Sequence, residues 1–364
     1  MEKTGIGVIG CGNISDIYLK NLQQTFLGTR VVACADILPE RAKAKAEKWS
    51  VPKAVSVDEL LRDPEVEIVV NLTIPVVHAE VDRKALEAGK HVHSEKPLAV
   101  TFADGSALMK LAQKRSLRLG CAPDTFMGAG IQACRALIDD GAIGAPVGAV
   151  AFMTCPGHES WHPDPEFYYK PGGGPMLDMG PYYVTALVSL LGPVRRVSGA
   201  SRISFPERTI GSEPKRGTKI KVEVPTHVSG TLEFADGAIA TLIMSFDVWG
   251  AHLPWIEIYG SEGSLAVPDP NTFGGPISLL PARSKEWKSM PVTRAYSENS
   301  RGVAVADMAK AIREKKQHRA NGELAGHVLE IMHGILEAAK GAKRYDLTTT
   351  CERPKPVPAD GGGL

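Results

Sequence analysis

The fold is indicated first by residues 5–15, which read Gly5-Ile-Gly-Val-Ile-Gly-Cys-Gly-Asn-Ile-Ser15. The run up to Ile9 is short and apolar, as in a buried strand, and the residues after the glycines have the pattern of a helix. Gly10 permits a tight turn, and Gly12 lets the backbone approach a pyrophosphate at the helix N-terminus. The segment therefore resembles the dinucleotide fingerprint G-x-G-x-x-G in its required setting, with Ser15 in place of the third glycine.

A second predicted strand, residues 30–36, ends in an acid, Asp36. This acid lies roughly twenty residues beyond the glycines, where a carboxylate binds the ribose hydroxyls of adenosine. A carboxylate there repels the 2′-phosphate of NADP, so we expect NAD as the cofactor and rank NADP behind it. Arg41 is nearby and would soften this preference. The alternative is a tight turn in an α/β protein that binds no cofactor.

Strands and helices continue to alternate as far as residue 122, with short connections. Residues 66–72 form a β-branched run, and Ser56-x-x-Glu59 has the pattern of a capping box. Such alternation predicts a doubly wound parallel sheet of the Rossmann type. Ligands of these sheets bind outside the carboxyl ends of the strands. The predicted strand ends carry four residues that could line one crevice: Asp36, Thr73, Pro75 and Lys96.

The stretch from His93 to Pro97 (His-Ser-Glu-Lys-Pro) falls at the end of the next predicted strand. Beside a bound nicotinamide, Lys96 could accept a hydroxyl proton while a hydride leaves the same carbon. Burial and the positive nicotinamide ring would both favour the neutral amine that a general base requires. The alternative is a surface Glu–Lys pair that happens to precede a proline.

Beyond residue 192 the pattern changes from alternation to successive strands. Residues 227–234 and 238–246 flank Ala235-Asp236-Gly237, a strong hairpin signal. Runs of strands fit a separate sheet domain. We therefore expect three parts: a Rossmann dinucleotide-binding domain at 1–123, a substrate-binding and oligomerisation domain at 124–352, and a loosely held tail at 353–364.

Residues 156–175 are rich in proline, glycine, histidine and aromatic residues, and they predict a loop. Residues 158–162 match the zinc-protease motif H-E-x-x-H, but that motif binds zinc only on a helix. Prolines 156, 163 and 165 disfavour a continuous helix, so we predict no metal site. We interpret the loop as a wall of a small-ligand pocket, with a surface loop packed on the sheet as the alternative. Its candidate substrate ligands are His158, Trp161, His162 and Lys170.

Composition and charge exclude several classes of function. The formal net charge is +1, so nucleic acid or an anionic membrane is not expected as the main partner. No apolar run is long enough to span a bilayer. The six cysteines are scattered without a Cys-x-x-Cys pair, which is typical of reduced thiols in the cytoplasm. Met1 to Thr4 lead directly into the first apolar run, so no signal peptide is expected.

Taken in order, these motifs resemble those of the Gfo/Idh/MocA family, which includes glucose–fructose oxidoreductase and inositol dehydrogenase. The resemblance is carried by residues 7–12, Asp36, residues 71–78, Glu95-Lys96-Pro97 and residues 172–180. It implies an N-terminal Rossmann domain and a C-terminal α/β domain with a large open, mainly antiparallel sheet. It also implies NAD(P)-dependent redox chemistry on sugars, polyols or related compounds, in a homo-oligomer such as a dimer or tetramer.

The resemblance also implies site residues. The family's catalytic pattern is a lysine followed by D-x-G-x-H; Lys96 and Asp178 match it, whereas Tyr182 stands at the histidine position, as in some relatives. Tyrosine is a poor base at neutral pH, which moves the role of proton acceptor towards Lys96. Asp124, just after the last Rossmann strand, is a further candidate substrate ligand. The expected cofactor-binding residues are Gly10, Gly12, Asn13, Ile14, Asp36, Thr73, Pro75, His78, Glu95 and Lys96.

We therefore expect an oxidoreductase that transfers a hydride between a nicotinamide cofactor and a secondary alcohol of a sugar, sugar derivative, glycoside or cyclitol. Lys96 would be the general acid/base, and Asp178 and Tyr182 would orient the substrate oxygens. Two alternatives stay open. One is a glycoside hydrolase that retains its NAD and works by oxidation, elimination and reduction. The other is a non-catalytic regulator that binds dinucleotide or sugar.

Overall fold

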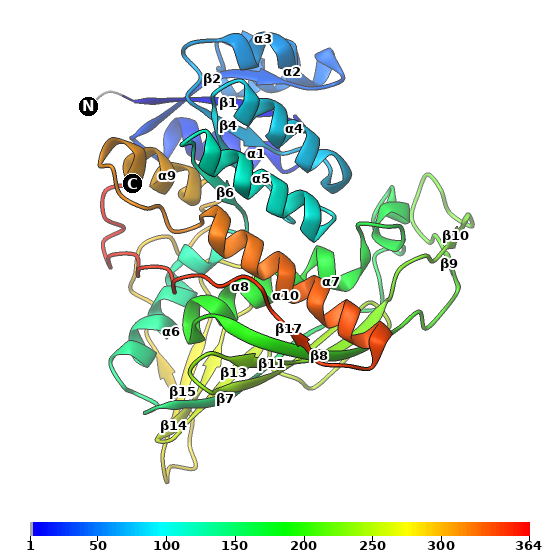
Figure 1. Ribbon diagram of the computed structural model, residues 1–364, viewed down its shortest axis with the longest axis vertical. Coiled ribbons are helices and arrows are strands. Elements are labelled where there is room, and N and C mark those ends of the chain that lie inside the picture. Colours follow the sequence, from blue (N-terminus) through cyan, green and yellow to red (C-terminus); the bar gives the residue numbers. More distant parts are fainter. Residues whose placement is uncertain (1–2) are drawn as a thin grey trace. The chain divides into compact units, whose positions relative to one another are not determined.

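The computed structural model describes residues 3–364, and the chain divides into two compact units (Figure 1). Unit 1 contains the chain up to Ala129 together with Arg294–Gly326 and Pro354–Leu364. Unit 2 contains Gly130–Thr293 and His327–Arg353. The expected second domain is thus interrupted, because residues 294–326 return to unit 1. Within residues 3–364 no helix has the length and apolar character needed to cross a membrane.

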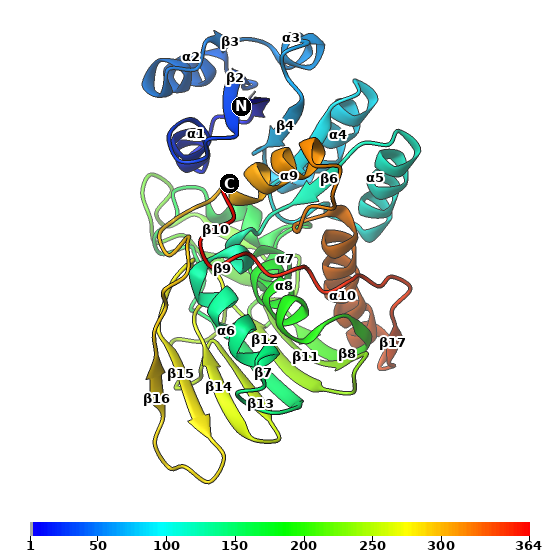
Figure 2. The ribbon, with the colours of Figure 1, turned by 90° about the vertical axis from the view of Figure 1, so that its left-hand side faces the viewer.

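Unit 1 is built on a six-stranded parallel sheet in the order β3-β2-β1-β4-β5-β6, with helices on both of its faces (Figure 2). This confirms the predicted doubly wound sheet. The strands are β1 (Thr4–Ile9), β2 (Thr29–Ala35), β3 (Lys53–Ala54), β4 (Ile68–Asn71), β5 (His91–Ser94) and β6 (Leu119–Cys121). The connecting helices are α1 (Ser15–Gln24), α2 (Pro39–Trp49), α3 (Val57–Arg62), α4 (Pro75–Glu87) and α5 (Phe102–Lys114).

Local sequence signals set the ends of several of these helices. Ser56 accepts a hydrogen bond from the backbone N–H of Glu59, and the Glu59 carboxylate accepts one from Ser56, which confirms the predicted capping box before α3. Pro39 and Pro75 open α2 and α4, where the missing N–H of proline costs nothing. These signals lie within a few residues of the ends that they fix.

The C-terminal tail packs on unit 1 rather than lying loosely on it. Arg319 donates hydrogen bonds to the carbonyl oxygens of Lys355 and Pro356, both at 3.0 Å. Val357 is buried, and Tyr296 donates to the carbonyl oxygen of Gly361. The Pro/Gly-rich composition predicted a loose end, but side chains more than thirty residues away satisfy its carbonyl groups.

Unit 2 is built on a nine-stranded sheet in the order β16-β15-β14-β13-β7-β12-β11-β8-β17. All neighbouring strands are antiparallel except the pair β7 and β12, which confirms a mainly antiparallel sheet. The strands are β7 (Pro146–Thr154), β8 (Val194–Arg202), β11 (His227–Phe234), β12 (Ile239–Ser245), β13 (Ile256–Gly260), β14 (Gly263–Val267), β15 (Ile277–Pro281), β16 (Lys288–Met290) and β17 (Tyr345–Asp346).

Three helices of unit 2 cover one face of this sheet (Figures 1 and 2). They are α6 (Ala129–Asp139), α8 (Gly180–Leu191) and α10 (Gly322–Gly341), and the short α7 (Gly174–Asp178) precedes α8. Gly199 and Gly230 are paired on β8 and β11, and a Cβ atom on either would contact Ile335 of α10. The absence of side chains at these two positions lets α10 approach the sheet closely. A separate ribbon of β9 (Glu207–Thr209) and β10 (Lys219–Lys221) completes the unit.

Candidate functional site

The strands of unit 1 end in one row. Strand pairing aligns Ala35, Ile9, Asn71, Ser94 and Cys121 across β2, β1, β4, β5 and β6. The segments that leave this row carry the predicted cofactor residues, because each begins one or a few positions after a strand end. The sheet therefore brings the glycine turn, Asp36, the Thr73 segment and Glu95-Lys96 to the same edge, where ligands of doubly wound sheets bind.

The glycine turn fits a dinucleotide pyrophosphate. Gly10 has a φ of +99°, and a Cβ atom there would lie 2.6 Å from the backbone of Leu72, so only glycine suits this position. Gly12 has nothing within 4 Å of the place where a Cβ atom would stand. The space beside Gly12 is thus open to a phosphate, while Asn13 is exposed and Ile14 half-buried at the start of α1.

Ser15 takes the place of the third glycine without disturbing the turn. It is fully buried, and its hydroxyl donates a 2.6 Å hydrogen bond to the carbonyl oxygen of Gly12. The backbone N–H of Ser15 donates to the same oxygen. The serine therefore ties the turn to the first residue of α1, whereas a glycine would only leave room for close packing.

Asp36 is held by the glycine turn itself. Its Oδ2 accepts a 2.7 Å hydrogen bond from the backbone N–H of Cys11, and its Oδ1 accepts one of 2.9 Å from Leu38. Each carboxylate oxygen keeps a further lone pair, so the group could still accept hydrogen bonds from ribose hydroxyls. Ile37 follows with 91% of its surface exposed, and Ile74 after β4 is 63% exposed. Exposed apolar side chains at this edge would suit the flat face of a base, a feature that sequence analysis missed.

His78 lies behind the segments that follow the strand ends. The side chain is fully buried on α4; its Nδ1 lies 2.8 Å from the carbonyl oxygen of Pro97 and its Nε2 2.9 Å from that of Thr73. Asn71 accepts hydrogen bonds from the backbone N–H and the hydroxyl of Thr73. His78 was predicted to bind the cofactor; the structure instead buries it between the segments after β4 and β5, where it can act only through them.

Glu95 fixes the backbone of Lys96. Its Oε1 accepts a 2.9 Å hydrogen bond from the hydroxyl of Tyr18 on α1, and its Oε2 accepts one of 2.9 Å from the Lys96 backbone N–H. Burial raises the pKa of Tyr18 well above its usual value, so its phenol stays protonated and donates. The Lys96–Pro97 peptide is cis, and Lys96 itself is half-buried. Tyr18 gave no sequence signal beyond the apolar face of its helix.

Asp124 is engaged with a helix end. It is buried, and its Oδ2 accepts hydrogen bonds from the backbone N–H groups of Gly302 (2.7 Å) and Ala304 (3.4 Å) at the start of α9 (Val303–Arg313). A carboxylate is favoured there by the unpaired N–H groups and the helix dipole. Burial raises the pKa of Asp124 to about 6. Its predicted contact with substrate gains no support from this geometry, and we leave it out of the proposed site.

In unit 2 the loop after β7 forms an aromatic cluster. Residues 158–162 form no helix, and Pro165–Tyr169 form a short 3-10 helix, which confirms the predicted loop. The H-E-x-x-H residues therefore lack the helix on which that motif binds zinc. The His158 ring lies 4.3 Å from the Tyr168 ring, 4.6 Å from that of Phe246 and 5.3 Å from that of Trp161, between centroids. Among residues 3–364, no three His, Cys, Asp or Glu side chains are grouped to hold a metal ion.

A buried ion network holds this loop in place. Arg208 of β9 donates a 2.7 Å hydrogen bond to Glu159, a 3.1 Å bond to the carbonyl oxygen of Pro156, and a further bond to the carboxylate of Asp247. Tyr169 donates to the second Glu159 oxygen. The glutamate of the H-E-x-x-H pattern is therefore a structural anchor. Arg208 was not anticipated from the sequence, because its partners are 39 to 52 positions away.

Only some of the predicted site residues of unit 2 lie close to one another. Asp178 ends α7, and its Oδ2 lies 3.5 Å from His158 Nε2; Tyr182 is buried on the following helix, α8. His162 joins the aromatic cluster, with its ring 5.4 Å from that of Tyr168. Lys170 instead forms a half-exposed ion pair with Glu223 at 2.9 Å.

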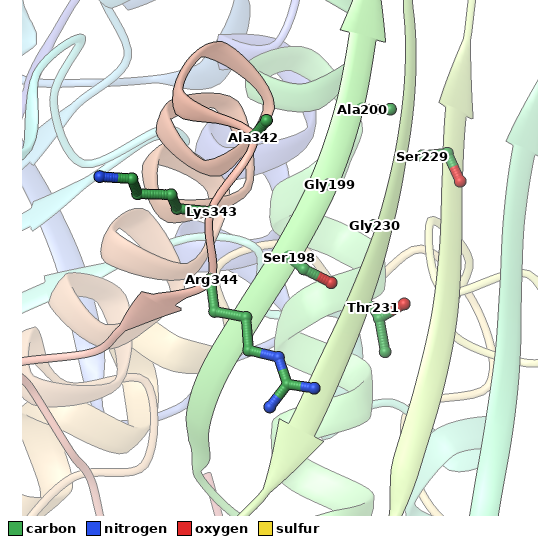
Figure 3. A pocket seen from close by; sticks show the side chains of 9 residues that line it. All are labelled: Ser198, Gly199, Ala200, Ser229, Gly230, Thr231, Ala342, Lys343 and Arg344. Atoms are coloured by element: carbon green, nitrogen blue, oxygen red, sulfur yellow. The ribbon is translucent and has the colours of Figure 1, made fainter.

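A separate hollow of about 400 Å³ lies on the sheet of unit 2 (Figure 3). Hydroxyl side chains from β8 and β11 face it, and the segment after α10 borders it. None of the predicted site residues contributes to its lining, which consists of Ser198, Gly199, Ala200, Ser229, Gly230, Thr231, Ala342, Lys343 and Arg344.

Comparison with known protein families matches both parts of the chain. Residues 4–122 match the model of the oxidoreductase family with an NAD-binding Rossmann fold. Residues 131–266 match the model of the GFO/IDH/MocA C-terminal domain. The two matches follow the order of the two units along the chain and include the glycine turn, Lys96, His158 and Asp178.

Individual relatives agree with these models. An inositol 2-dehydrogenase of Ralstonia nicotianae is 30% identical over 278 residues, which is 73% of this chain and 74% of the relative. A dTDP-3,4-didehydro-2,6-dideoxy-alpha-D-glucose 3-reductase of Streptomyces violaceoruber is 29% identical over 92% of this chain and 95% of its own. Levoglucosan dehydrogenase in complex with NADH and L-sorbose has the same fold, with a TM-score of 0.82 and 21% identity over 96% of this chain and all of the other. This chain is therefore a member of the Gfo/Idh/MocA family of oxidoreductases with an NAD-binding Rossmann fold.

Proposed function

We propose that this protein transfers a hydride between NAD and a secondary alcohol of a sugar, sugar derivative or cyclitol. The observation that carries the proposal is the row of strand ends in unit 1, which brings the glycine turn, Asp36 and Glu95-Lys96 to one edge. Relatives named as an inositol dehydrogenase and a sugar reductase support the substrate class.

We propose NAD rather than NADP as the cofactor. Gly12 and the start of α1 would hold the pyrophosphate, and Asp36 would accept the ribose hydroxyls. A 2′-phosphate would instead meet the Asp36 carboxylate, whose oxygens already face the backbone N–H groups of Cys11 and Leu38. The NADH complex of levoglucosan dehydrogenase, which has the same fold, agrees with this choice.

Lys96 is proposed as the general acid/base. NAD, when bound, would supply the hydride acceptor; the chain's own task is to take the hydroxyl proton or return it. Glu95 holds the backbone of Lys96, and His78 holds the carbonyl of the next residue, Pro97. A lysine positioned in this way loses less conformational freedom when it acts. Asp178 and Tyr182 are proposed to orient the substrate oxygens.

We also propose that the protein forms a homo-oligomer, either a dimer or a tetramer. Val150, Phe152, Ile239, Ile243 and Tyr259 alternate with the buried residues of β7, β12 and β13 and lie exposed or half-buried. An apolar sheet face of this kind suits contact with another copy. The six cysteines are free, which supports a reducing compartment such as the cytoplasm.

The test is a near-ultraviolet absorbance screen for reduced nicotinamide. Wild type and Lys96→Met are mixed with NAD⁺ or NADP⁺ and a panel of sugars, inositols and glycosides, and Lys316→Met serves as a control because Lys316 is exposed. We expect a signal in wild type and the control, and a loss of about a hundredfold or more in Lys96→Met, the usual scale for a lost acid/base group. NAD should still bind to all three proteins.

Other outcomes point to the two alternatives. Near-normal turnover in Lys96→Met would remove the lysine from the mechanism. Bound dinucleotide without net reduction, together with release of the aglycone from a glycoside, would indicate the hydrolase that recycles its NAD. Dinucleotide binding without any turnover would indicate a regulator.

A further inference from the structure

His78 is a fully buried histidine whose two ring nitrogens both face carbonyl oxygens. Nδ1 lies 2.8 Å from the carbonyl oxygen of Pro97, and Nε2 lies 2.9 Å from that of Thr73. A carbonyl oxygen can only accept a hydrogen bond, so each ring nitrogen must donate an N–H. A neutral imidazole has one N–H and would turn the lone pair of its other nitrogen towards an oxygen, whereas an imidazolium donates from both. The contacts of His78 therefore require the charged form.

A carboxylate on the same face of the helix balances this charge. Asp82 follows His78 by one turn of α4 and is also fully buried. Asn71 joins the two residues, because its amide nitrogen donates to the carbonyl oxygen of His78 at 3.2 Å and to Asp82 Oδ1 at 2.7 Å. Burial raises the pKa of Asp82 to about 6, while the hydrogen bond from Asn71 and the charge of His78 oppose that rise. Asp82 is thus a carboxylate at neutral pH, and buried charges persist in proteins when they are paired.

His78 bridges two segments beyond the strands to which they belong. β4 and β5 pair up to their last residues, and the backbone N–H that follows β5 donates to the end of β4 at 2.8 Å. Thr73 and Pro97 each lie two positions further along the chain from this bond, and His78 joins them. Because Pro97 directly follows Lys96, a bond to its carbonyl oxygen fixes the chain on the C-terminal side of Lys96.

We propose that His78 is a positioning residue that stays an imidazolium at neutral pH, with Asp82 as its counter-charge. It clamps Thr73 and Pro97 together and adds a fixed positive charge next to the Lys96 segment. The inference rests on the proposed function, in which Lys96 takes a hydroxyl proton. A nearby positive charge disfavours a protonated lysine, so it favours the neutral amine that a base requires. His78 acts on the reaction through Lys96, without touching substrate or cofactor.

Other titratable groups around this clamp come from α1, the segment after β5 and the end of β6. Burial raises the pKa of Tyr18 and of Cys121 well above their usual values, so both stay neutral. The Glu95 carboxylate accepts hydrogen bonds from the Tyr18 hydroxyl and the Lys96 backbone N–H. The charges that act beside His78 are thus those of Asp82, Glu95 and Lys96.

The protonation of His78 can be measured without any substrate. Nitrogen-15 NMR of histidine-labelled protein counts the N–H groups of each imidazole, and His78→Gln identifies the His78 signals, with His78→Asn in its place should that variant not fold. His91 is the internal control, because its Nδ1 accepts a 2.8 Å hydrogen bond from the backbone N–H of Arg118 and so holds no proton. At about pH 7.5, where an ordinary histidine is only about one-tenth charged, we expect two N–H groups on His78 and one on His91.

Asp82→Asn tests the counter-charge in the same experiment. The substitution keeps an oxygen for the amide of Asn71 but leaves the imidazolium without a negative partner. A buried charge that loses its partner is strongly disfavoured, so the doubly protonated fraction of His78 should fall by at least about half. An unchanged fraction would show that Asp82 does not balance the charge and would overturn the proposed pair.

Turnover of myo-inositol, levoglucosan or D-glucose with NAD⁺ tests the effect on Lys96. His78→Gln keeps a donor but no charge, and kcat/KM should fall at least about tenfold, since a misplaced catalytic group is costly. On the acid side of the pH profile, the pH of half-maximal kcat/KM should rise by at least about half a unit, because Lys96 is protonated more readily without the positive charge. In Asp82→Asn, which removes a negative charge, the same pH should fall or stay unchanged.

His91→Gln is the matched control, because glutamine can accept from Arg118 and His91 does not contact the clamp; its profile should match wild type. Fluorescence titration with NADH and thermal unfolding show whether each variant is folded and binds cofactor. A purely structural role for His78 would lower kcat/KM without moving the acid side of the profile.

A single N–H on His78 in wild type overturns the proposal whatever the activity. An acid side that stays in place in His78→Gln, or that rises equally in Asp82→Asn, overturns it as well. If wild type oxidises none of the three probes, the proposed function fails instead. The NMR measurement then still decides whether His78 is a charged clamp: two N–H groups support the clamp, and one refutes it.

Discussion

The two units place their functional groups in different ways. In unit 1, the strand register aligns the ends of five strands, and the predicted cofactor residues follow from those ends. In unit 2, His158 stands on a loop that a buried network of Arg208, Glu159 and Asp247 holds against the sheet. The first arrangement depends on backbone pairing and the second on a few side chains. The two should therefore respond to different kinds of substitution.

The largest effect is expected for Arg208→Met. Its side chain is only 10% exposed and is shared by two carboxylates, so its removal leaves uncompensated buried charge. Breaking a buried ion pair by removing one partner typically costs about 3–5 kcal/mol. We expect a loss of that size in the free energy of unfolding of the protein, measured by urea denaturation, together with loss of sugar turnover.

The control is Lys170→Met, which removes a half-exposed ion pair with Glu223 from the same loop. Surface pairs contribute about 0–1 kcal/mol, so this variant should unfold almost like wild type. NADH affinity should be unchanged in both variants. Equal stability of Arg208→Met and Lys170→Met would mean that the buried network does not hold the loop.

Unit 1 should instead be sensitive at its glycine turn. In Gly10→Ala the new Cβ atom would meet the backbone of Leu72, and the φ of +99° disfavours any side chain. We expect a cost of about 2–3 kcal/mol in unfolding free energy, since strained backbone positions cost about 1–3 kcal/mol each and the contact adds to this.

Gly12→Ala is the matched control, because the added methyl group meets no protein atom within 4 Å. It should leave stability unchanged but weaken NAD binding at least about tenfold, since the methyl group would stand where we propose that the pyrophosphate approaches. Fluorescence titration with NADH measures this. If Gly12→Ala binds NADH as tightly as wild type, the phosphate does not sit at this turn.

The same contrast explains how much could be predicted from the sequence. The glycine turn, Asp36 and the Lys96 segment were identified because each signal lies within a few residues of the structure it determines. Parallel strand pairing then places them at one edge without further information. The β-branched run at residues 66–72 forms a shorter strand, Ile68–Asn71. Its last residue still aligns with Ile9 at the end of β1.

Contacts between distant positions could not be predicted. Tyr18 and Glu95 are 77 residues apart, and Asp124 binds the backbone N–H of Gly302, the N-cap of α9, which is 178 residues later. The position of Asp124 just after a strand suggested a ligand for substrate, and only the packed structure shows that it is buried and which N–H groups it satisfies. Likewise, His158 and Asp178 were each named as candidates, but nothing local indicated that Nε2 and Oδ2 would lie 3.5 Å apart.

A smaller effect is expected for Asp36→Asn. The amide keeps an oxygen for the Cys11 N–H but loses the charge that we propose repels a 2′-phosphate. The ratio of kcat/KM for NADP to that for NAD should rise about tenfold, which corresponds to about 1.4 kcal/mol. Steady-state kinetics with both cofactors measures the ratio. An unchanged ratio would show that Asp36 organises the turn but does not select the cofactor.

The smallest effect concerns a buried histidine of unit 2, His327 on α10. Its Nε2 accepts a 3.0 Å hydrogen bond from the backbone N–H of Val194, and its Nδ1 lies 2.9 Å from the hydroxyl of Thr349. Burial lowers the pKa of His327 to about 4. The unfolded chain, with an ordinary histidine pKa near 6.5, therefore binds a proton more readily than the folded protein. The stability contributed by His327 is present above pH 6.5 and is lost as the pH falls towards 4.

Comparison of wild type with His327→Gln should isolate the pH-dependent stability contributed by His327. Glutamine can accept the hydrogen bond from the Val194 N–H but does not titrate. Between pH 7 and pH 6, wild type should lose roughly 0.7 kcal/mol more unfolding free energy than the variant. In unit 1, burial raises the pKa of Asp82 and Asp124 to about 6, which acts in the opposite direction, and the difference between the two proteins removes that contribution. Parallel urea titrations at the two pH values measure it; identical pH slopes would mean that the folded protein protonates His327 as easily as the unfolded chain does.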